Sequence, residues 1–407
     1  ACNTTGCCNE AIGYRALYSN TTGCCNVAIG RQAMYNHKTG CSNVGIGNST
    51  LYNGNSGCYN VAVGECALYD NWGGDNNVAV GRCSLRNNTT GTRNIALGNL
   101  ALKANTTGGE NFAAGYSSLE ENTTGYYNIA LGTNALKKNT TASYNIALNL
   151  CALRSNTTGT MNIAMGYQSL YYNISGNCNI GLGRETLQAS YGGDHNIAMG
   201  LCTLRCNTTG DHNTGIGCGV LFANTTGSCN VGMGINAGRY NANGSTGTTS
   251  PDNSTYLGAC TRAYSVSSTN ETVLGYCACG CGDNTISFGN ANVTDNYFNG
   301  NIIACATDPR IRVEATAGNH PGFEWLEAGS RKWITYNDPD SSQGGNDNLT
   351  WKNASDTELM ELDQDGMLYV SSKIVHLDDT DTFINFTDDD INIQAGGVNF
   401  IDITEGA

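Results

Sequence analysis

An Asn recurs every 17 residues across the first 230 residues of the chain, with no insertion between successive repeats. The fourteen positions are Asn9, Asn26, Asn43, Asn60, Asn77, Asn94, Asn111, Asn128, Asn145, Asn162, Asn179, Asn196, Asn213 and Asn230. A fixed period of this length indicates a solenoid, in which each repeat packs mainly against its neighbours. Such a chain forms a rod without a central cleft, so we expect its function to depend on reach and on surface.

Each repeat reads Asn-aliphatic-small-aliphatic-Gly, then a small residue and Leu, then Asn-Thr-Thr-Gly, as in residues 94–108. The pattern fits two short strands and two turns, because Asn and Gly accept left-handed backbone conformations. An α-solenoid is disfavoured, since a Gly in almost every repeat would cost roughly 1 kcal/mol relative to Ala. We expect the Leu or Met that recurs from Leu17 to Leu221 to fill the coil interior.

The tripeptide Asn-Thr-Thr is also a sequon for N-glycosylation. It begins at nine positions, which are Asn3, Asn20, Asn88, Asn105, Asn122, Asn139, Asn156, Asn207 and Asn224. Because the repeat alone explains this recurrence, we interpret the tripeptide as a turn, with glycosylation as the alternative. Stacked Asn side chains can in addition form amide ladders.

On each predicted strand a small residue, Ala or Gly, stands between two larger aliphatic residues. Alternation with period 2 places the small residue on one face and the large residues on the other. A strand that is apolar on both faces must be covered on both, and one thin coil covers only one of them. We therefore predict a partner chain over the second face, with the small-residue column as the close contact.

The composition favours an all-β, extracellular protein, because 53 of the 407 residues are Gly and only 13% are charged. The formal net charge of −14, without a basic cluster, argues against a nucleic-acid partner. No apolar run is long enough to span a membrane, so we expect no membrane insertion. The chain begins with neither an initiator Met nor a signal peptide and is interpreted as a processed product or part of a longer protein.

The twenty cysteines follow the repeat. Three columns hold twelve of them, namely Cys7, Cys24, Cys41 and Cys58, then Cys66, Cys83, Cys151 and Cys202, then Cys8, Cys25, Cys178 and Cys229. We interpret most of them as small packing residues. Column neighbours would lie ~4.8 Å apart at Cα, so disulfides between coils or between chains are the alternative.

The strict period ends near Asn241, and the spacing and composition then change. We predict a shaft of 17-residue repeats at 1–240, a loop or linker at 241–256 and variant coils with 17- and 14-residue spacings at 257–301. A small β-domain with Trp residues is predicted at 302–370, and an acidic fibrous β-segment at 371–407.

Candidate sites are few. Cys277, Cys279 and Cys281 would lie on one strand face and could bind a soft metal such as zinc, but the usual Cys-x-x-Cys spacing is missing, so a packed or oxidised thiol cluster is the simpler interpretation. His195 and His212 share a column and each follows an Asp, which could orient the imidazoles. A solvated turn explains both pairs equally well.

Trp325, Trp333 and Trp351 are candidate receptor contacts, because exposed aromatic side chains stack on sugars and dominate interfaces, although a core role is the alternative. No acidic column indicates glycoside cleavage, and the Gly-x-Gly segments are repeat positions and not phosphate loops. We therefore predict that the chain is not an enzyme, with no catalytic residue and no cofactor.

The repeat Asn-x-Ala-Ile/Leu-Gly with Asn-Thr-Thr-Gly, and the later segments 271–275 and 283–290, resemble the β-roll heads of trimeric autotransporter adhesins. They are even more similar to the shafts of bacteriophage tail fibres, as are segments 296–302 and 379–386. The resemblance implies a homotrimer with three β-rolls around a threefold axis. The Cys-rich columns and the strict 17-residue unit depart from the adhesin pattern.

Our leading interpretation is a trimeric phage tail fibre or virion appendage that spaces and presents a surface for binding the host receptor. Its expected partners are its own copies, other virion or surface-filament proteins, and a host-cell surface glycan or protein. A bacterial surface adhesin or extracellular filament subunit is the alternative. An ice- or carbohydrate-binding solenoid would need an unbroken Thr array, which Lys38, Asn55 and Trp72 interrupt.

Overall fold

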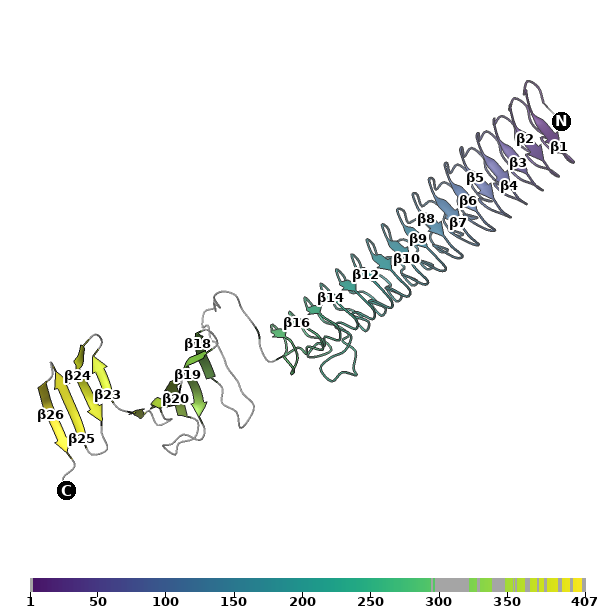
Figure 1. The fold of residues 1–407 in the computed structure, drawn as a ribbon. Coiled ribbons are helices and arrows are strands. Elements are labelled where there is room, and N and C mark those ends of the chain that lie inside the picture. Colours follow the sequence, from purple (N-terminus) through teal and green to yellow (C-terminus); the bar gives the residue numbers. More distant parts are fainter. Residues whose placement is uncertain are drawn as a thin grey trace. The chain divides into compact units, whose positions relative to one another are not determined.

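The computed structural model describes residues 3–293 and 296 and, further along the chain, 322–327, 330–338, 348–353, 355, 357–362, 367–371, 373–376, 379–386, 390–395 and 398–404. The chain divides into two compact units, Ala1–Asn296 and Tyr297–Ala407 (Figure 1). The described residues form strands and turns and include no helix. The predicted all-β solenoid is confirmed.

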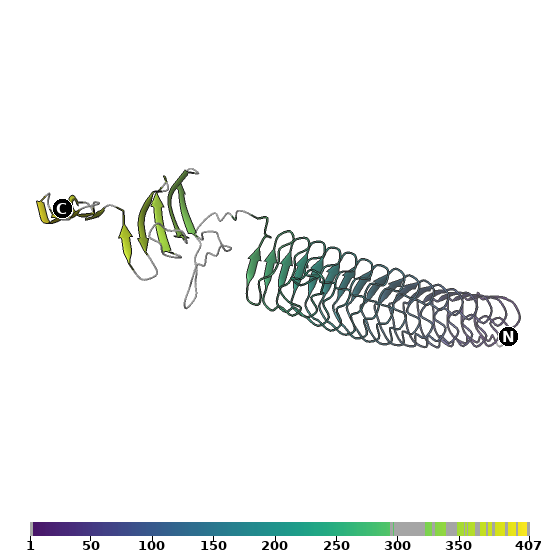
Figure 2. The ribbon, with the colours of Figure 1, turned by 90° about the horizontal axis from the view of Figure 1, so that it is seen from below.

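The first unit is a β-solenoid in which each coil contributes one three-residue strand to a single parallel sheet. The seventeen strands are β1 (Glu10–Ile12), β2 (Val27–Ile29), β3 (Val44–Ile46), β4 (Val61–Val63), β5 (Val78–Val80), β6 (Ile95–Leu97), β7 (Phe112–Ala114), β8 (Ile129–Leu131), β9 (Ile146–Leu148), β10 (Ile163–Met165), β11 (Ile180–Leu182), β12 (Ile197–Met199), β13 (Thr214–Ile216), β14 (Val231–Met233), β15 (Thr255–Leu257), β16 (Thr272–Leu274) and β17 (Ile286–Phe288). Equivalent residues pair in register, so Ala96 of β6 lies between Ala79 and Ala113. The strands follow one another along one side of the solenoid (Figure 2).

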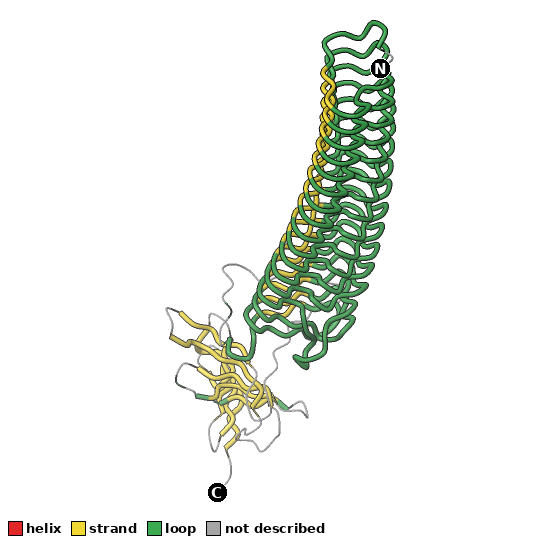
Figure 3. Tube along the Cα trace, turned by 90° about the vertical axis from the view of Figure 1, so that its right-hand side faces the viewer, coloured by secondary structure: helices red, strands yellow, loops and turns green. Residues whose placement is uncertain are grey.

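Turns make up the rest of each coil (Figure 3), so the expectation of two strands per repeat is wrong. The reason is the backbone around the Leu column, where Leu100 and Leu102 have left-handed φ angles of 63° and 51°. A strand cannot continue through such residues. The turns are instead tied to the next coil by backbone hydrogen bonds, such as the one from Leu102 N–H to the carbonyl O of Ser118 at 3.0 Å.

A Gly follows almost every strand because the coils approach closely there. At Gly98, φ is 136°, and a Cβ would lie 2.6 Å from the carbonyl O of Gly115 in the next coil. A residue with a side chain would be strained at this position, both by the φ angle and by the short distance. Asn149, with φ of 101°, is the one residue other than Gly in this column.

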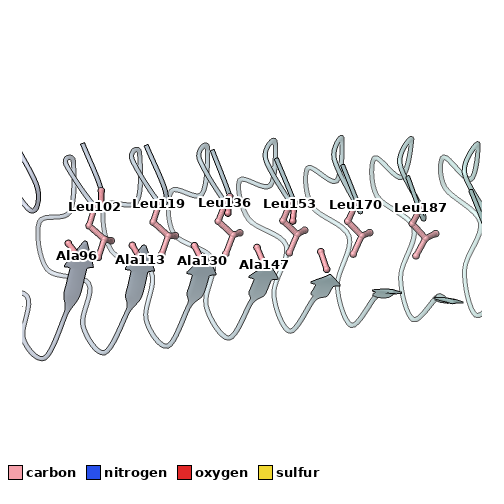
Figure 4. Close-up of a cluster of buried hydrophobic side chains, with 14 of the residues drawn as sticks. Ala96, Leu102, Ala113, Leu119, Ala130, Leu136, Ala147, Leu153, Leu170 and Leu187 are labelled. Carbon is pink, nitrogen blue, oxygen red and sulfur yellow. The ribbon is translucent and has the colours of Figure 1, made fainter. Parts of the chain in front are cut away.

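The interior of the solenoid is filled by the buried Ala or Gly in the middle of strands β2 to β14 and by the buried Leu column (Figure 4). In β15 and β16 the larger Tyr256 and Val273 take the place of the small residue. Figure 4 shows Ala96 and its equivalents pointing from the strands toward Leu102 and its equivalents. The prediction that Leu fills the coil interior is confirmed. The prediction that the small-residue column contacts a partner chain is wrong, because this column faces the interior of its own coil. The coil is narrow, and a Cβ added at Gly45 would lie 3.1 Å from Cε of Met34.

The 17-residue Asn column is a buried ladder of side-chain amides. Asn111 Nδ2 donates to Oδ1 of Asn94 at 3.0 Å and to the carbonyl O of Gly125 at 2.8 Å. The backbone N–H of Asn111 donates to the same Oδ1 at 3.1 Å. Because one amide serves backbone and side-chain groups of two coils, losing it would leave buried groups of both coils unpaired.

A second Asn column begins each Asn-Thr-Thr-Gly corner. Asn105 Nδ2 donates to the carbonyl O of Gly108 at 2.9 Å and to Oδ1 of Asn88 at 2.7 Å, and Thr106 Oγ1 donates to the carbonyl O of Thr123 at 3.0 Å. The turn interpretation is confirmed. Eight of the nine sequon Asn side chains are buried in this way, all except that of Asn3. A buried, hydrogen-bonded amide is inaccessible to glycosylation in the folded coil.

The loop expected at 241–256 lies within one enlarged coil of the same solenoid. Val231 of β14 pairs with Thr255 of β15, so this coil holds 24 residues instead of 17. The carbonyl O of Pro251 accepts the hydrogen bond from Nδ2 of Asn230 at 2.6 Å, so the inserted segment continues the Asn ladder. The pairing of Thr272 with Ile286 gives the last coil its shorter, 14-residue spacing.

The second unit contains two antiparallel sheets. The first consists of β18 (Gly322–Glu327), β19 (Ser330–Asp338), β20 (Asn348–Asn353), β21 (Glu358–Leu362) and β22 (Leu368–Val370). The second consists of β23 (Lys373–His376), β24 (Asp379–Phe386), β25 (Asp390–Ala395) and β26 (Val398–Thr404). Residues 302–321 of the expected Trp-containing domain lie outside the described residues.

Candidate interaction surface

The outer side of the parallel sheet is the strongest candidate for an interaction surface. Because the middle residue of each strand points into the coil, the first and third residues point outward. We call these outward residues of β2 to β14 the aliphatic face. Its first column is Val27, Val44, Val61, Val78, Ile95, Phe112, Ile129, Ile146, Ile163, Ile180, Ile197, Thr214 and Val231, and its second is Ile29, Ile46, Val63, Val80, Leu97, Ala114, Leu131, Leu148, Met165, Leu182, Met199, Ile216 and Met233.

The aliphatic face remains accessible to solvent in the single chain. Ile95 and Leu97 are 39% and 38% exposed, and Met233 is 47% exposed. No side chain of the face is charged, and Thr214 is its one polar member. Apolar surfaces that continue over so many strands are rare on soluble monomers and mark sites of association.

In the sequence, charged residues stand shortly before and shortly after the strands that form the aliphatic face. Just after the strand Gly, Arg82 pairs with Glu65 of the preceding coil at 3.2 Å. Just before the ladder Asn, Arg93 pairs with Glu110 of the next coil at 3.0 Å. Both pairs are at least one-third exposed, so each contributes less than about 1 kcal/mol. An apolar strip with a polar border matches the organisation of protein interfaces.

The two candidate His residues lie in the column just before the ladder Asn. The rings of His195 and His212 stack with centroids 4.9 Å apart, and both residues are exposed. The carboxylates of the preceding Asp residues accept backbone N–H bonds, from Asn177 to Asp194 at 2.6 Å and from Asp194 to Asp211 at 2.7 Å. These Asp side chains therefore hold successive coils together.

The three candidate metal ligands line one cavity of about 700 Å³, together with Tyr276 and Phe288. Cys277 and Cys279 are half-buried and Cys281 is exposed. Within the described part of the chain, no group of three or more His, Cys, Asp or Glu side chains is arranged to hold a metal ion.

The candidate Trp residues lie on the first sheet of the second unit. Trp325 of β18 pairs through the backbone with Trp333 of β19, and the side chains of both lie outside what the structure describes. Trp351 of β20 is half-buried. The proposed receptor contact at these residues stays a prediction.

The first cysteine column, which holds Cys7, Cys24, Cys41 and Cys58, has a role that the sequence interpretation missed. Cys41 Sγ accepts a hydrogen bond from the backbone N–H of Cys24 in the preceding coil, and Cys58 Sγ accepts one from that of Cys41, both at 3.2 Å. In the next coil Asp75 takes this position, and its Oδ1 accepts the backbone N–H of Cys58 at 2.7 Å. The described cysteines are all exposed or half-buried, so none of them fills the interior of the coil. The signal was the replacement of Cys by Asp, Asn and Ser in one column, since all of these accept hydrogen bonds.

Buried titratable groups near the last coils serve the fold. Both carboxylate oxygens of Glu271 accept the backbone N–H of Tyr264, at 3.2 and 3.1 Å, and one also accepts that of Gly282 at 3.2 Å. Tyr256 Oη lies 3.4 Å from the same carboxylate, and burial raises the pKa of this phenol well above its ordinary value.

Comparison of the chain with protein-family models and with curated proteins finds no match. Among the described residues, no helix has the length and apolarity needed to cross a membrane. Arguments about function therefore depend on the solenoid and its surfaces.

Proposed function

We propose that this chain is the subunit of a homotrimeric fibre, a phage tail fibre or similar virion appendage, which holds a receptor-binding surface at a distance from the particle. The aliphatic face carries the proposal. It runs in register along thirteen strands, from β2 to β14, and a fibre subunit with this face turned inward buries it against identical faces.

The number of copies comes from the resemblance to tail-fibre shafts, and the packing is physically reasonable. Each coil offers one straight apolar side, and three such sides can meet around an axis with the charged residues beside them facing outward. Burying apolar area contributes roughly 25 cal/mol per Å². Three identical receptor contacts on one rigid fibre would also raise the overall avidity without a new contact.

Native mass tests the proposal. The full chain of 42.8 kDa should elute as a species of three times that mass by size exclusion with light scattering, with and without reductant. The double variant Ile129→Glu and Leu131→Glu places two carboxylates on the aliphatic face and should lower the mass to that of one chain, because unpaired buried charges are costly.

The matched control is Thr107→Glu with Thr124→Glu, which adds the same charge at two exposed corner residues. It should keep the trimer mass. A stable wild-type monomer would refute the buried face, and a stable dimer would refute the threefold fibre.

A further inference from the structure

Cys7 and Cys24 occupy the same column on adjacent coils, and their sulfur atoms are in contact. The Sγ–Sγ distance is 3.2 Å, with the Cys7 thiol donating to Cys24, and the backbone N–H of Cys7 donates to the same Cys24 Sγ at 3.3 Å. Equivalent residues on neighbouring coils are ~4.8 Å apart at Cα, within the range that a disulfide spans. Because the sulfurs are closer than the backbones, the two side chains converge.

The environment distinguishes the two thiols. Hydrogen bonds from the backbone N–H and the thiol of Cys7 lower the pKa of Cys24, which favours its thiolate. The same thiol hydrogen bond raises the pKa of Cys7 to about 11, which keeps Cys7 protonated. Cys7 is exposed and Cys24 is half-buried, so a small reagent can reach the pair. A thiolate beside a second thiol is the arrangement that thiol–disulfide exchange requires.

We propose that Cys7 and Cys24 are a redox-active pair that forms a disulfide between adjacent coils by exchange with a low-molecular-weight disulfide such as oxidised glutathione. The Cys24 thiolate attacks one sulfur of oxidised glutathione, breaks its S–S bond and releases one glutathione thiolate, which takes up a proton. The Cys7 thiol then loses its proton to solvent and attacks Cys24 Sγ. This step forms the protein disulfide and releases the second glutathione, so two protein thiols are oxidised and one glutathione disulfide is reduced to two thiols.

The disulfide would close a loop of one coil and fix the register of two neighbouring coils. In an array where each coil contacts only its neighbours, a covalent bond between two coils prevents them from separating locally. The pair is therefore a modification site that responds to the redox state of the surroundings. The inference depends on contacts within one chain and is independent of the proposed oligomer.

The test uses the full, fully reduced chain in oxygen-free glutathione buffers, with unreacted thiols blocked at successive times by N-ethylmaleimide. Peptide mapping by mass spectrometry should find the Cys7–Cys24 bond as the first disulfide. Cys7→Ser should abolish this bond and leave a lasting glutathione adduct on Cys24. Cys24→Ser should abolish both the bond and the early adduct.

Cys58→Ser is the matched control, since it removes a thiol of the same column two coils beyond Cys24, where its contacts are with Cys41 and Ser56; it should form the Cys7–Cys24 bond at the wild-type rate. Earlier formation of any other disulfide, or a bond only between separate chains on a non-reducing gel, would overturn the proposal. So would an equal lifetime of the Cys24 adduct with and without Cys7.

Discussion

Backbone conformation, as well as volume, selects the residue in the Leu column. Leu102 has a φ of 51°, a region that costs L-residues roughly 1–2 kcal/mol. Burial of a Leu side chain contributes about 1.5–3 kcal/mol and offsets this cost. The column from Leu17 to Leu221 holds Leu and, once, Met34, but never Ile or Val. A branched Cβ fits the left-handed region poorly, which explains the preference.

Substituting Leu102 tests this explanation. Leu102→Met should lower the free energy of unfolding by less than about 1.5 kcal/mol, because Met conserves volume and is unbranched at Cβ. Leu102→Ile should lower it by about 2 kcal/mol or more, because the strain of the backbone is added. Urea denaturation followed by circular dichroism measures both values. Equal losses would show that only volume matters in this column.

His37 occupies an Asn position of the second ladder and should make the stability of the fold depend on pH. Its ring is fully buried with Nε2 3.0 Å from Nδ2 of Asn43. Gly54 follows in the next coil, and a Cβ there would overlap Nδ1 of His37. The ring therefore uses space that only Gly leaves. Burial lowers the pKa of His37 from 6.5 to about 4.

This depressed pKa predicts acid sensitivity. The unfolded chain takes up the His37 proton near pH 6.5 and the folded chain only near pH 4, so the contribution is complete above pH 6.5 and is lost as the pH falls. Between pH 7.5 and pH 5 the free energy of unfolding should fall by about 2 kcal/mol from this residue. Denaturation of the wild type and of His37→Asn at both values isolates the effect. A variant that loses as much stability as the wild type would contradict it.

At the scale of the repeat element, the sequence predicts the coil and its turns better than it predicts which face of each strand points into the coil. The period, the β-character, the buried Leu column and the Asn corner were readable, because each depends on local chemistry. Alternation alone does not tell which strand face is the interior, so the prediction places the Ala/Gly column on the wrong side. The deciding fact is three-dimensional: the turn that carries Leu102 folds back over Ala96 and leaves Ile95 and Leu97 outside. The acceptor role of Cys24, Cys41 and Cys58 cannot be predicted from one repeat, because the hydrogen bond joins two successive coils.

Within the repeat, we expect the largest loss of stability from substitutions in the Asn ladder. Asn111→Ala removes the amide that donates to Asn94 and to the carbonyl O of Gly125, and it leaves the backbone N–H of Asn128 without its acceptor. We expect a loss of about 3 kcal/mol or more, because each buried group left unpaired costs roughly 1–3 kcal/mol. Hydrogen exchange should become faster mainly in the coils next to the change, because coils contact only their neighbours.

Thr107→Ala is the control for this experiment, since it changes an exposed side chain on the same solenoid and should stay within about 0.5 kcal/mol of the wild type. Uniformly faster exchange over all coils in Asn111→Ala would mean that the solenoid opens as one cooperative unit and not coil by coil.

At the scale of the whole molecule, the two units differ in what they can contribute to assembly. The hydrophobic core from Leu17 to Ala278 and the entire aliphatic face belong to the first unit, Ala1–Asn296. That unit has its own interior and both Asn ladders, so we expect it to fold without the second unit. If the aliphatic face drives association, the oligomeric state should be a property of the solenoid alone.

A fragment of residues 1–296 should therefore keep the β-rich circular dichroism of the solenoid and the same number of copies as the full chain. Because the face is apolar, 1 M NaCl should leave the mass unchanged, whereas association through surface ion pairs would weaken as salt screens the charges. Light scattering of the fragment and of the full chain, side by side, measures this. Placing Ile129→Glu and Leu131→Glu in the fragment should give a single copy that retains the solenoid spectrum. A monomeric wild-type fragment beside a trimeric full chain would locate the association in the second unit and refute the role of the aliphatic face.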